Sequence, residues 1–237
     1  MIAYPAVDLR AGYAVQLVGG EPGSDRVRLP DPVAVAGSWV AAGFGGLHIV
    51  DLDAALGTGD NRAVVDAILA VTEVPVQVGG GVRDDAHVAS LFGAGATRVM
   101  VGTRAVEDPA WLWRIADRWP GRIVVAADMR DGSILTRGWT QVIDQDVESL
   151  LATFEDLPLA AVLVTDVRRE GRMQGIDAAT FARLAAGTRH DVMAAGGISS
   201  IEDLRTLDRA GLAGAVLGMS LYTGAIEARA AATEFAS

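Results

Sequence analysis

Eight short runs of apolar residues, separated by longer segments with helix start and stop signals, extend along the whole chain. Apolar runs without polar interruptions are typical of strands buried on both faces, as in a parallel sheet. Eight strand–helix units in 237 residues predict an α/β fold, a single (β/α)8 TIM barrel that occupies residues 1–237 as one domain. An open, doubly wound sheet is the alternative. The predicted strands are residues 2–7, 47–50, 75–78, 98–101, 123–127, 161–165, 192–195 and 213–217.

Some connections between these runs carry signals of their own. Residues 9–31 are rich in glycine and proline, and a loop of this length in a compact domain is usually functional, often a lid. Residues 129–140 are expected to form a hairpin loop. Asp31-Pro32 predicts a helix start, with Asp as the cap and Pro at the first helical position. Ser199 followed by Glu202 predicts a capping box for a later helix.

The two halves of the chain repeat one pattern at a constant spacing. An apolar strand that runs into Gly80-Gly81 recurs 116 positions later as a strand that runs into Gly196-Gly197. In each copy the next strand also ends in a glycine, Gly102 or Gly218. A half-barrel that is copied once closes naturally. The repeat therefore favours the barrel and indicates an internal two-fold half-barrel symmetry.

These glycines lie at strand–helix junctions, where backbone N–H groups can approach an anion at a helix N-terminus. Two such sites, one in each half, suit a small molecule with a phosphate at each end. For a single copy, tight strand–helix turns would be the simpler interpretation. Two copies in register, each with a further glycine after the next strand, favour phosphate binding.

Carboxylates follow the first and fifth predicted strands as part of the same repeat. The Asp-x-Arg-x-Gly pattern of residues 8–12 recurs at residues 128–132. In a barrel, both acids would lie on opposite walls of one opening, between the two phosphate sites. This placement favours a chemical role for Asp8 and Asp128. An Asp that ends a strand often only caps the next turn, and this is the interpretation we prefer for Asp51, Asp53 and Asp166.

Composition excludes several classes of partner and site. The net charge is −10, so nucleic acid is not an expected partner, and phosphates must be bound by local donors. The chain has no cysteine, and its three histidines are too scattered for a zinc site, so no metal is predicted. The sequence contains neither an apolar run of membrane-spanning length nor a secretory leader. We therefore expect a cytoplasmic protein with no membrane partner.

Motifs along essentially the whole chain together resemble one family. They are Pro5–Leu9, His48–Asp53, VGGGVRDD at 78–85, RGW at 137–139, TDV at 165–167 and AAGGISS at 194–200. The chain resembles the phosphoribosyl-formimino aminoimidazole carboxamide ribotide (ProFAR) isomerases of histidine biosynthesis. Within them it is most similar to the actinobacterial branch called phosphoribosyl isomerase A. That branch also isomerises phosphoribosylanthranilate in tryptophan biosynthesis.

The resemblance implies an aldose–ketose isomerase that performs an Amadori rearrangement of a small phosphoribosylamine, with no cofactor and no metal. The reaction needs an acid for the ribose ring oxygen and a base for the proton on C2. By resemblance the base is Asp8, the acid is Glu170 and Asp128 is a further catalytic position. The chain is expected to act as a monomer. The substrate and phosphate contacts implied are Gly80, Gly81, Arg83, Gly102, Thr103, Arg137, Trp139, Thr165, Gly196, Gly197 and Gly218.

Several loop residues depart from the family's pattern. Gln16 stands where the family usually has an Arg that would contact a phosphate, which predicts a weaker hold on one end of the substrate. The acid is usually Asp in a Lys-Asp-Gly-Thr loop, which is Arg169–Arg172 in this chain. Glu170 is longer by one methylene, and misplacement near 1 Å can lower a rate about a hundredfold. The departures spare the barrel, so they indicate an altered substrate preference, including a shift toward phosphoribosylanthranilate.

Two other functions stay open as alternatives. A cyclase-lyase subunit of the same pathway would need a glutaminase partner, and it usually has Cys before the Asp of the first strand, where this chain has Val7. A barrel that binds sugar phosphates without turnover is the non-enzymatic alternative, and the departures in the loops support it.

Overall fold

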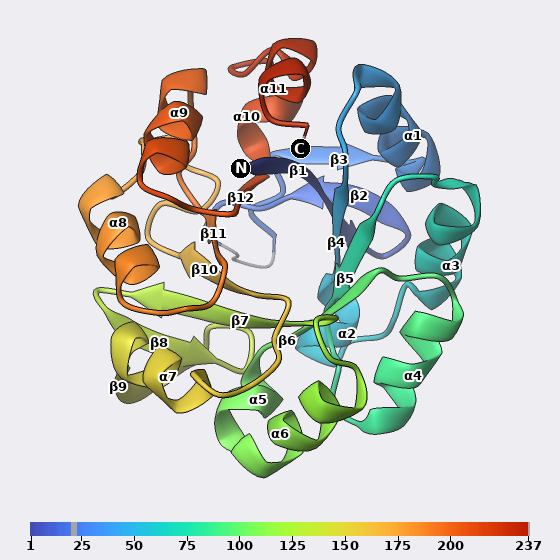
Figure 1. Ribbon diagram of the computed structural model, residues 1–237. Coiled ribbons are helices and arrows are strands. Elements are labelled where there is room, and N and C mark those ends of the chain that lie inside the picture. Colours follow the sequence, from blue (N-terminus) through green and yellow to red (C-terminus); the bar gives the residue numbers. More distant parts are fainter. Residues whose placement is uncertain (20–22, 237) are drawn as a thin grey trace.

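The computed structural model describes residues 1–19 and 23–236, and residues 20–22 and 237 lie outside this description. Within the described residues, eight parallel strands form a closed ring surrounded by helices (Figure 1). The last strand pairs with the first, starting with Gly214 opposite Ile2, so the ring has no open edge. The (β/α)8 barrel is confirmed, and the open doubly wound sheet is wrong. The barrel strands are β1 (Ile2–Arg10), β4 (Leu47–Asp51), β5 (Val76–Gly79), β6 (Arg98–Val101), β7 (Ile123–Arg130), β10 (Ala161–Asp166), β11 (Val192–Ala195) and β12 (Gly214–Leu217).

Long helices cover the outside of the ring, and short helices directly follow some of its strands (Figure 1). Among the described residues, no helix has both the length and the apolar character needed to cross a membrane. The outer helices are α1 (Pro32–Ala42), α3 (Arg62–Val71), α4 (Asp85–Gly93), α6 (Pro109–Arg118), α7 (Val147–Phe154), α8 (Ala178–Ala186), α9 (Ile201–Arg209) and α11 (Ala228–Glu234). The short helices are α2 (Leu52–Leu56), α5 (Thr103–Glu107) and α10 (Met219–Tyr222).

An antiparallel extension leaves the ring after β1 and another after β7, at equivalent places in the two halves. The hairpin predicted within residues 129–140 is confirmed, and a further antiparallel strand follows it from Gln141 to Asp146. The prediction of an unbroken loop at residues 9–31 is wrong. Ala11 and Gly12 have φ of 48° and 79°, and this two-residue turn returns the chain alongside β1. The extensions are β2 (Tyr13–Gln16) with β3 (Val27–Leu29), and β8 (Ser133–Thr136) with β9 (Gln141–Asp146).

The inside of the ring is filled by its own cluster of side chains, which includes Tyr4, Met100 and Met193. Two buried polar residues share this interior, and Nε2 of Gln77 lies 2.8 Å from Nδ1 of His48. Burial lowers the pKa of His48 to about 4. The imidazole is therefore neutral at pH 7 and behaves as a hydrogen-bonded core residue.

Helix starts follow the local sequence signals, with one correction. Asp31-Pro32 begins α1 as predicted, and the Asp side chain accepts a backbone N–H of the first turn. The capping box predicted from Ser199 and Glu202 is wrong, because the box is formed one position later by Ser200 and Asp203. The Asp203 carboxylate also accepts the backbone N–H and hydroxyl of Ser199. The Asp203 carboxylate thus accepts hydrogen bonds from both Ser199 and Ser200.

Backbone angles show the same two-fold repeat as the sequence. Gly80 and Gly196 have φ of 100° and 90°. Gly102 and Gly218 have φ of −109° and −106°, with ψ of −106° and −110°. A Cβ on Gly80 would collide with the backbone at the end of β4, and one on Gly196 would collide with the end of β10. The two halves therefore place equivalent glycines against equivalent strand ends.

We expect Gly80→Ala and Gly196→Ala to destabilise the protein by similar amounts, roughly 2–4 kcal/mol each. Each alanine would need a positive φ and would displace a neighbouring strand end. Gly37 in α1 has open space around its Cα, so Gly37→Ala should raise stability by up to about 1 kcal/mol. Urea unfolding of the three variants measures this. A Gly80→Ala or Gly196→Ala protein as stable as wild type would contradict the described backbone.

Candidate active site

The carboxyl ends of the barrel strands form one rim, which we call the mouth. Asp8 on β1 and Asp128 on β7 both lie at the mouth, and Thr165 on β10 is the register partner of Asp128. Glu170 follows β10 in the turn after Asp166. The structure thus brings the three predicted catalytic acids to one end of the barrel, where their charges act on one another.

Asp8 is held by a side chain of the neighbouring antiparallel strand. Nε2 of Gln16, on β2, donates a hydrogen bond of 3.1 Å to Oδ2 of Asp8. Gln16 is 1% exposed, so this contact is shielded from water. Burial raises the pKa of Asp8 to about 7, and the Gln16 hydrogen bond opposes this rise. A carboxyl with such a pKa is suited to act as a base near neutral pH.

Asp128 is held by different partners from those of its counterpart in the first half. Nε1 of Trp139 donates to Oδ2 of Asp128 at 2.7 Å, and Thr165 also hydrogen-bonds the carboxylate. Burial raises the pKa of Asp128, and the two hydrogen bonds lower it in part. Trp139 was expected to contact the substrate, and in the structure its indole N–H donates to Asp128.

The loop between β8 and β9 connects Asp128 on β7 with the segment that follows the adjacent strand β6. Arg137 and Trp139 have φ of 53° and 68°. Residues other than glycine rarely adopt a positive φ, and the conformation costs of order 1 kcal/mol or more per residue. The Arg137 N–H donates to Oγ1 of Thr103 at 2.8 Å. Its guanidinium, expected to contact the substrate, pairs with Glu107 at 2.9 Å in the structure.

Glu170 has a higher pKa than Asp8. Burial raises its pKa to about 8, and repulsion from Asp8, Asp128 and Asp166 adds to this rise. The carboxyl is therefore protonated near neutral pH. The backbone also closes at this point, because the Gly19 N–H donates to the Glu170 carbonyl at 3.0 Å. The described end of the first loop thus rests on the turn that carries the predicted acid.

The three acids interpreted as turn caps do serve that role. Asp51 accepts the Ala54 N–H at 3.1 Å and caps α2. Asp53 accepts a backbone N–H of the β1–β2 turn at 2.6 Å. Asp166 accepts the backbone N–H two residues later at 3.1 Å, and Nε of Arg169 pairs with it at 3.1 Å. These carboxylates hold the loops that surround the mouth.

Backbone groups of Gly80, Gly81, Gly102 and Thr103 form what we call the first cradle. Gly80 and Gly81 precede α4, and Gly102 is the N-cap residue of α5. A hollow of about 220 Å³ borders Gly80 on the side of α3 and α4, and the other residues of the cradle do not line it. Arg83, predicted to contact the substrate, is exposed and donates to two carbonyl oxygens of α2 at 3.3 and 3.5 Å. It fastens α2 to the edge of the first cradle.

Backbone groups of Gly196, Gly197 and Gly218 form the second cradle, on the opposite half of the barrel. The Gly175 N–H donates to the Gly197 carbonyl at 3.0 Å. Nη1 of Arg169 in turn donates to the Gly175 carbonyl at 3.1 Å. The loop that carries the predicted acid is therefore tied to the second cradle at its far end.

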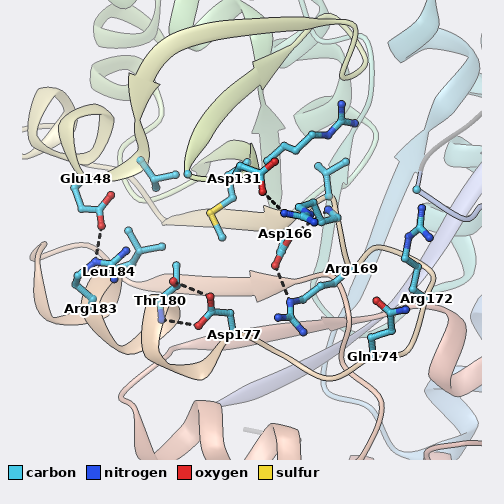
Figure 2. A pocket seen from close by; sticks show the side chains of 17 residues that line it. Asp131, Glu148, Asp166, Arg169, Arg172, Gln174, Asp177, Thr180, Arg183 and Leu184 are labelled. Atoms are coloured by element: carbon cyan, nitrogen blue, oxygen red, sulfur yellow. Dashed lines mark hydrogen bonds and ion pairs between the residues drawn. The ribbon is translucent and has the colours of Figure 1, made fainter.

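A polar crevice of about 890 Å³ lies on the outer side of this loop, toward the β7–β8 hairpin and α8 (Figure 2). Ion pairs along its walls join the loop to the β7–β8 hairpin and α8 to α7. The pairs of Arg168 and Arg183 are exposed and contribute little stability individually. The pairs are Arg168 with Asp131, Arg169 with Asp166 at 3.1 Å and Arg183 with Glu148 at 2.7 Å.

Two residues at the mouth were not predicted in the positions that they take. Gln16 was noted only as a departure from the family, although a polar residue within an apolar strand was a usable signal. Tyr222 of α10 had no signal, because only the fold brings it near β1, where its hydroxyl donates to the Ala6 carbonyl at 2.8 Å. Burial and the charge of Asp8 raise the pKa of Tyr222. Within the described ranges, no three His, Asp or Glu side chains are grouped to hold a metal ion.

Comparison with known proteins places this site in a family. A family model described as "Histidine biosynthesis protein" matches residues 2–227. The chain belongs to this family. A relative from Gemmatimonas aurantiaca is 51% identical over 99% of both chains, and one from Myxococcus xanthus is 48% identical over 100% of both. A third, from Dinoroseobacter shibae, is 45% identical over 96% of each. All three are named 1-(5-phosphoribosyl)-5-((5-phosphoribosylamino)methylideneamino) imidazole-4-carboxamide isomerases.

Membership in the histidine biosynthesis family covers the complete site. The matched residues 2–227 contain both cradles and all the acids at the mouth. The name shared by the three relatives refers to a single isomerase. The comparisons therefore establish the histidine biosynthesis family and do not extend to the actinobacterial branch with two substrates.

The raised pKa of Glu170 predicts a cost to stability that grows with pH. The folded protein keeps a proton on Glu170 up to about pH 8, whereas the unfolded chain releases it near 4.5. Unfolding stability due to this group therefore falls as pH rises from about 4.5 to 8. Glu170→Gln should then be more stable than wild type by roughly 1–3 kcal/mol at about pH 9, with a smaller gain at about pH 5.

Chemical denaturation at the two pH values measures this difference. Glu73→Gln is the control, since Glu73 is exposed in the connection between α3 and β5. This variant should show no pH-dependent gain in the free energy of unfolding. An equal effect of Glu170→Gln at both pH values would contradict the buried, repelled carboxyl.

Proposed function

We propose that the protein is a ProFAR isomerase of histidine biosynthesis that works by acid–base catalysis. The observation that carries the proposal is the pair Asp8 and Glu170, whose pKa values are raised to about 7 and 8, between two equivalent glycine cradles. Titratable groups whose pKa values are shifted toward neutrality are typical of catalytic sites. The name of relatives that share about half of the residues supports the same activity.

Glu170 is the general acid of this proposal. Its higher pKa keeps it protonated near neutral pH, and it transfers this proton to the ribose ring oxygen. The C1–O bond breaks, the lone pair of the attached nitrogen forms a C1=N bond, and the ring opens to a Schiff base. The longer Glu side chain reaches from a loop that is tied to the second cradle.

Asp8 is the general base. Its lower pKa makes it the partner that ionises first, and its carboxylate takes the proton from C2. The C–H electrons form a C1=C2 bond and neutralise the nitrogen, which gives an enaminol. Transfer of a proton from the C2 hydroxyl to C1 then yields the aminoketose. The proton on Asp8 returns to Glu170 through solvent between turnovers.

The two cradles bind the phosphates in this proposal. Helix starts and glycine backbones present N–H groups to an anion. The protein has a net charge of −10, so its overall charge does not attract phosphates, and these local donors must bind them. Binding at both ends fixes the reacting carbons between the two acids, which lowers the entropic cost of reaching the transition state. All the residues involved belong to one barrel, so we propose that a monomer suffices.

We expect Asp8→Asn to lower kcat on ProFAR by roughly 10²–10⁴-fold, because the amide has nearly the same shape but cannot accept the C2 proton. Asp117→Asn, on an exposed face of α6, is the control and should keep wild-type turnover. Steady-state assays with thermal melting of each variant measure the effect. Normal turnover of Asp8→Asn would refute the base. Tight binding of ProFAR by the wild type without turnover would instead favour a non-catalytic barrel.

Phosphoribosylanthranilate is a second candidate substrate, in line with the resemblance to the branch that accepts both. The observation that favours it is the neutral Gln16 against Gly218 of the second cradle, where the family usually has Arg. A cradle with less positive charge contributes less binding free energy to a phosphate. A substrate that lacks the second phosphate therefore gives up less affinity in this chain. We expect kcat/KM on phosphoribosylanthranilate to be within about a thousandfold of that on ProFAR, a gap of about 4 kcal/mol. No detectable turnover of phosphoribosylanthranilate would remove this candidate.

A further inference from the structure

Gln16 makes two contacts that join separate parts of the site. Its Nε2 donates to Oδ2 of Asp8 at 3.1 Å. Its Oε1 lies against the Cα of Gly218, so closely that a Cβ on Gly218 would collide with it. The side chain is 1% exposed, so both contacts are buried. Gln16 is therefore held between the proposed base and the second cradle.

The other half of the barrel lacks an equivalent contact. Asp8 pairs in register with Val15 of β2, and Asp128 pairs in the same way with Leu135 of β8. The next residue along the hairpin is Gln16 in the first half and Thr136 in the second. Thr136 is buried, and its hydroxyl has no hydrogen-bond partner among the described residues. Contact with the acid is thus a property of Gln16 and not of the hairpin scaffold.

We propose that Gln16 is a positioning residue for the Asp8 carboxylate, and that its packing on Gly218 makes the second cradle part of that positioning. The inference rests on the proposed role of Asp8 as the base. Gln16 stands where the family usually has an Arg that would contact a phosphate, and in this chain the side chain at that position donates to Asp8.

The surroundings of Asp8 make this one hydrogen bond important. The titratable groups that face it are Glu170 from the loop after β10, Tyr222 from α10 and, one layer deeper in the barrel, His48. The first two are acids, and buried His48 is neutral at pH 7. Among the described residues, no cation therefore stabilises the Asp8 carboxylate in place of Gln16. Loss of the Gln16 donor should disfavour the ionised form of Asp8.

The test is a direct titration of Asp8 in the free protein, with ¹³C-aspartate labelling and Asp8→Asn to assign the signal. In Gln16→Met, which keeps length and loses the donor, we expect the Asp8 titration to move up by about one pH unit. In Gln16→Lys, which places a cation beside the carboxylate, it should move down. Gln77→Met is the matched control, because Gln77 is an equally buried barrel glutamine bonded to His48, and it should leave the titration unchanged.

A second pair of variants tests the contact with the cradle without altering Gln16. Gly218→Ala would displace the Gln16 side chain and should move the Asp8 titration up, as Gln16→Met does. Gly102 has nearly the same backbone angles, and a Cβ there would make only an ordinary contact at 3.7 Å. Gly102→Ala should therefore not move it. This arm holds even if Gln16→Met fails to fold.

The acid limb of the kcat/KM profile should follow the same order, with a loss of about tenfold for Gln16→Met near pH 6 and little loss near pH 8. If Gln16 had a purely structural role, Gln16→Met would lower kcat/KM equally at both pH values. Shifts of the same sign in Gln16→Met and Gln16→Lys, or no shift with Gly218→Ala, would overturn the proposal. If the wild type has no isomerase activity but the titration shifts as expected, the proposed function fails and the hold of Gln16 on Asp8 stands.

Discussion

Partial burial of several carboxyls around one opening is the constraint on which the site depends. Burial removes water from around Asp8, Asp128 and Glu170, so the pKa of each carboxyl rises. Repulsion by the neighbouring carboxylates raises the pKa of Glu170 further. Such an arrangement is unfavourable for folding, since buried charge is opposed by desolvation and like charges repel. The closed, parallel ring can maintain it because hydrogen bonds along every strand fix the strand ends that carry the acids.

The duplicated half-barrel supplies symmetric supports, and the side chains around them differ between the halves. Gly80 and Gly196 lie against equivalent strand ends with similar φ, so both cradles are built alike. The acids differ, because Asp8 receives a hydrogen bond from Gln16, whereas Asp128 receives one from Trp139. This difference separates the environments of two carboxyls that the repeat would otherwise make equal. The two symmetry-related carboxyls therefore need not share one role, and the proposed acid, Glu170, comes from the loop after β10.

The fold and the position of the acids could be predicted because they depend on local and periodic signals. Apolar runs, glycine pairs and strand-end aspartates repeat at fixed spacing, and a barrel places all strand ends on one rim. The short β2 could not be predicted because it lies within a glycine-rich segment. The cap at Ser200 could not be predicted because it depends on which acid hydrogen-bonds the backbone N–H of the N-cap residue. Contacts that cross the chain, such as Gln16 with Gly218, follow only from the closed ring. The positive φ of Arg137 and Trp139 has no sequence signal, because neither residue favours that conformation.

The central claim is that Asp8 and Glu170 face each other closely enough for their charges to repel. A double-mutant cycle with Asp8→Asn, Glu170→Gln and the double variant, followed by urea unfolding at about pH 9, measures that repulsion directly. Each single variant removes the repulsion once, so the double variant should gain less stability than the sum of the singles, by about 1 kcal/mol or more. Additivity within about 0.5 kcal/mol would mean that the two carboxyls do not share a mouth, and it would contradict the account.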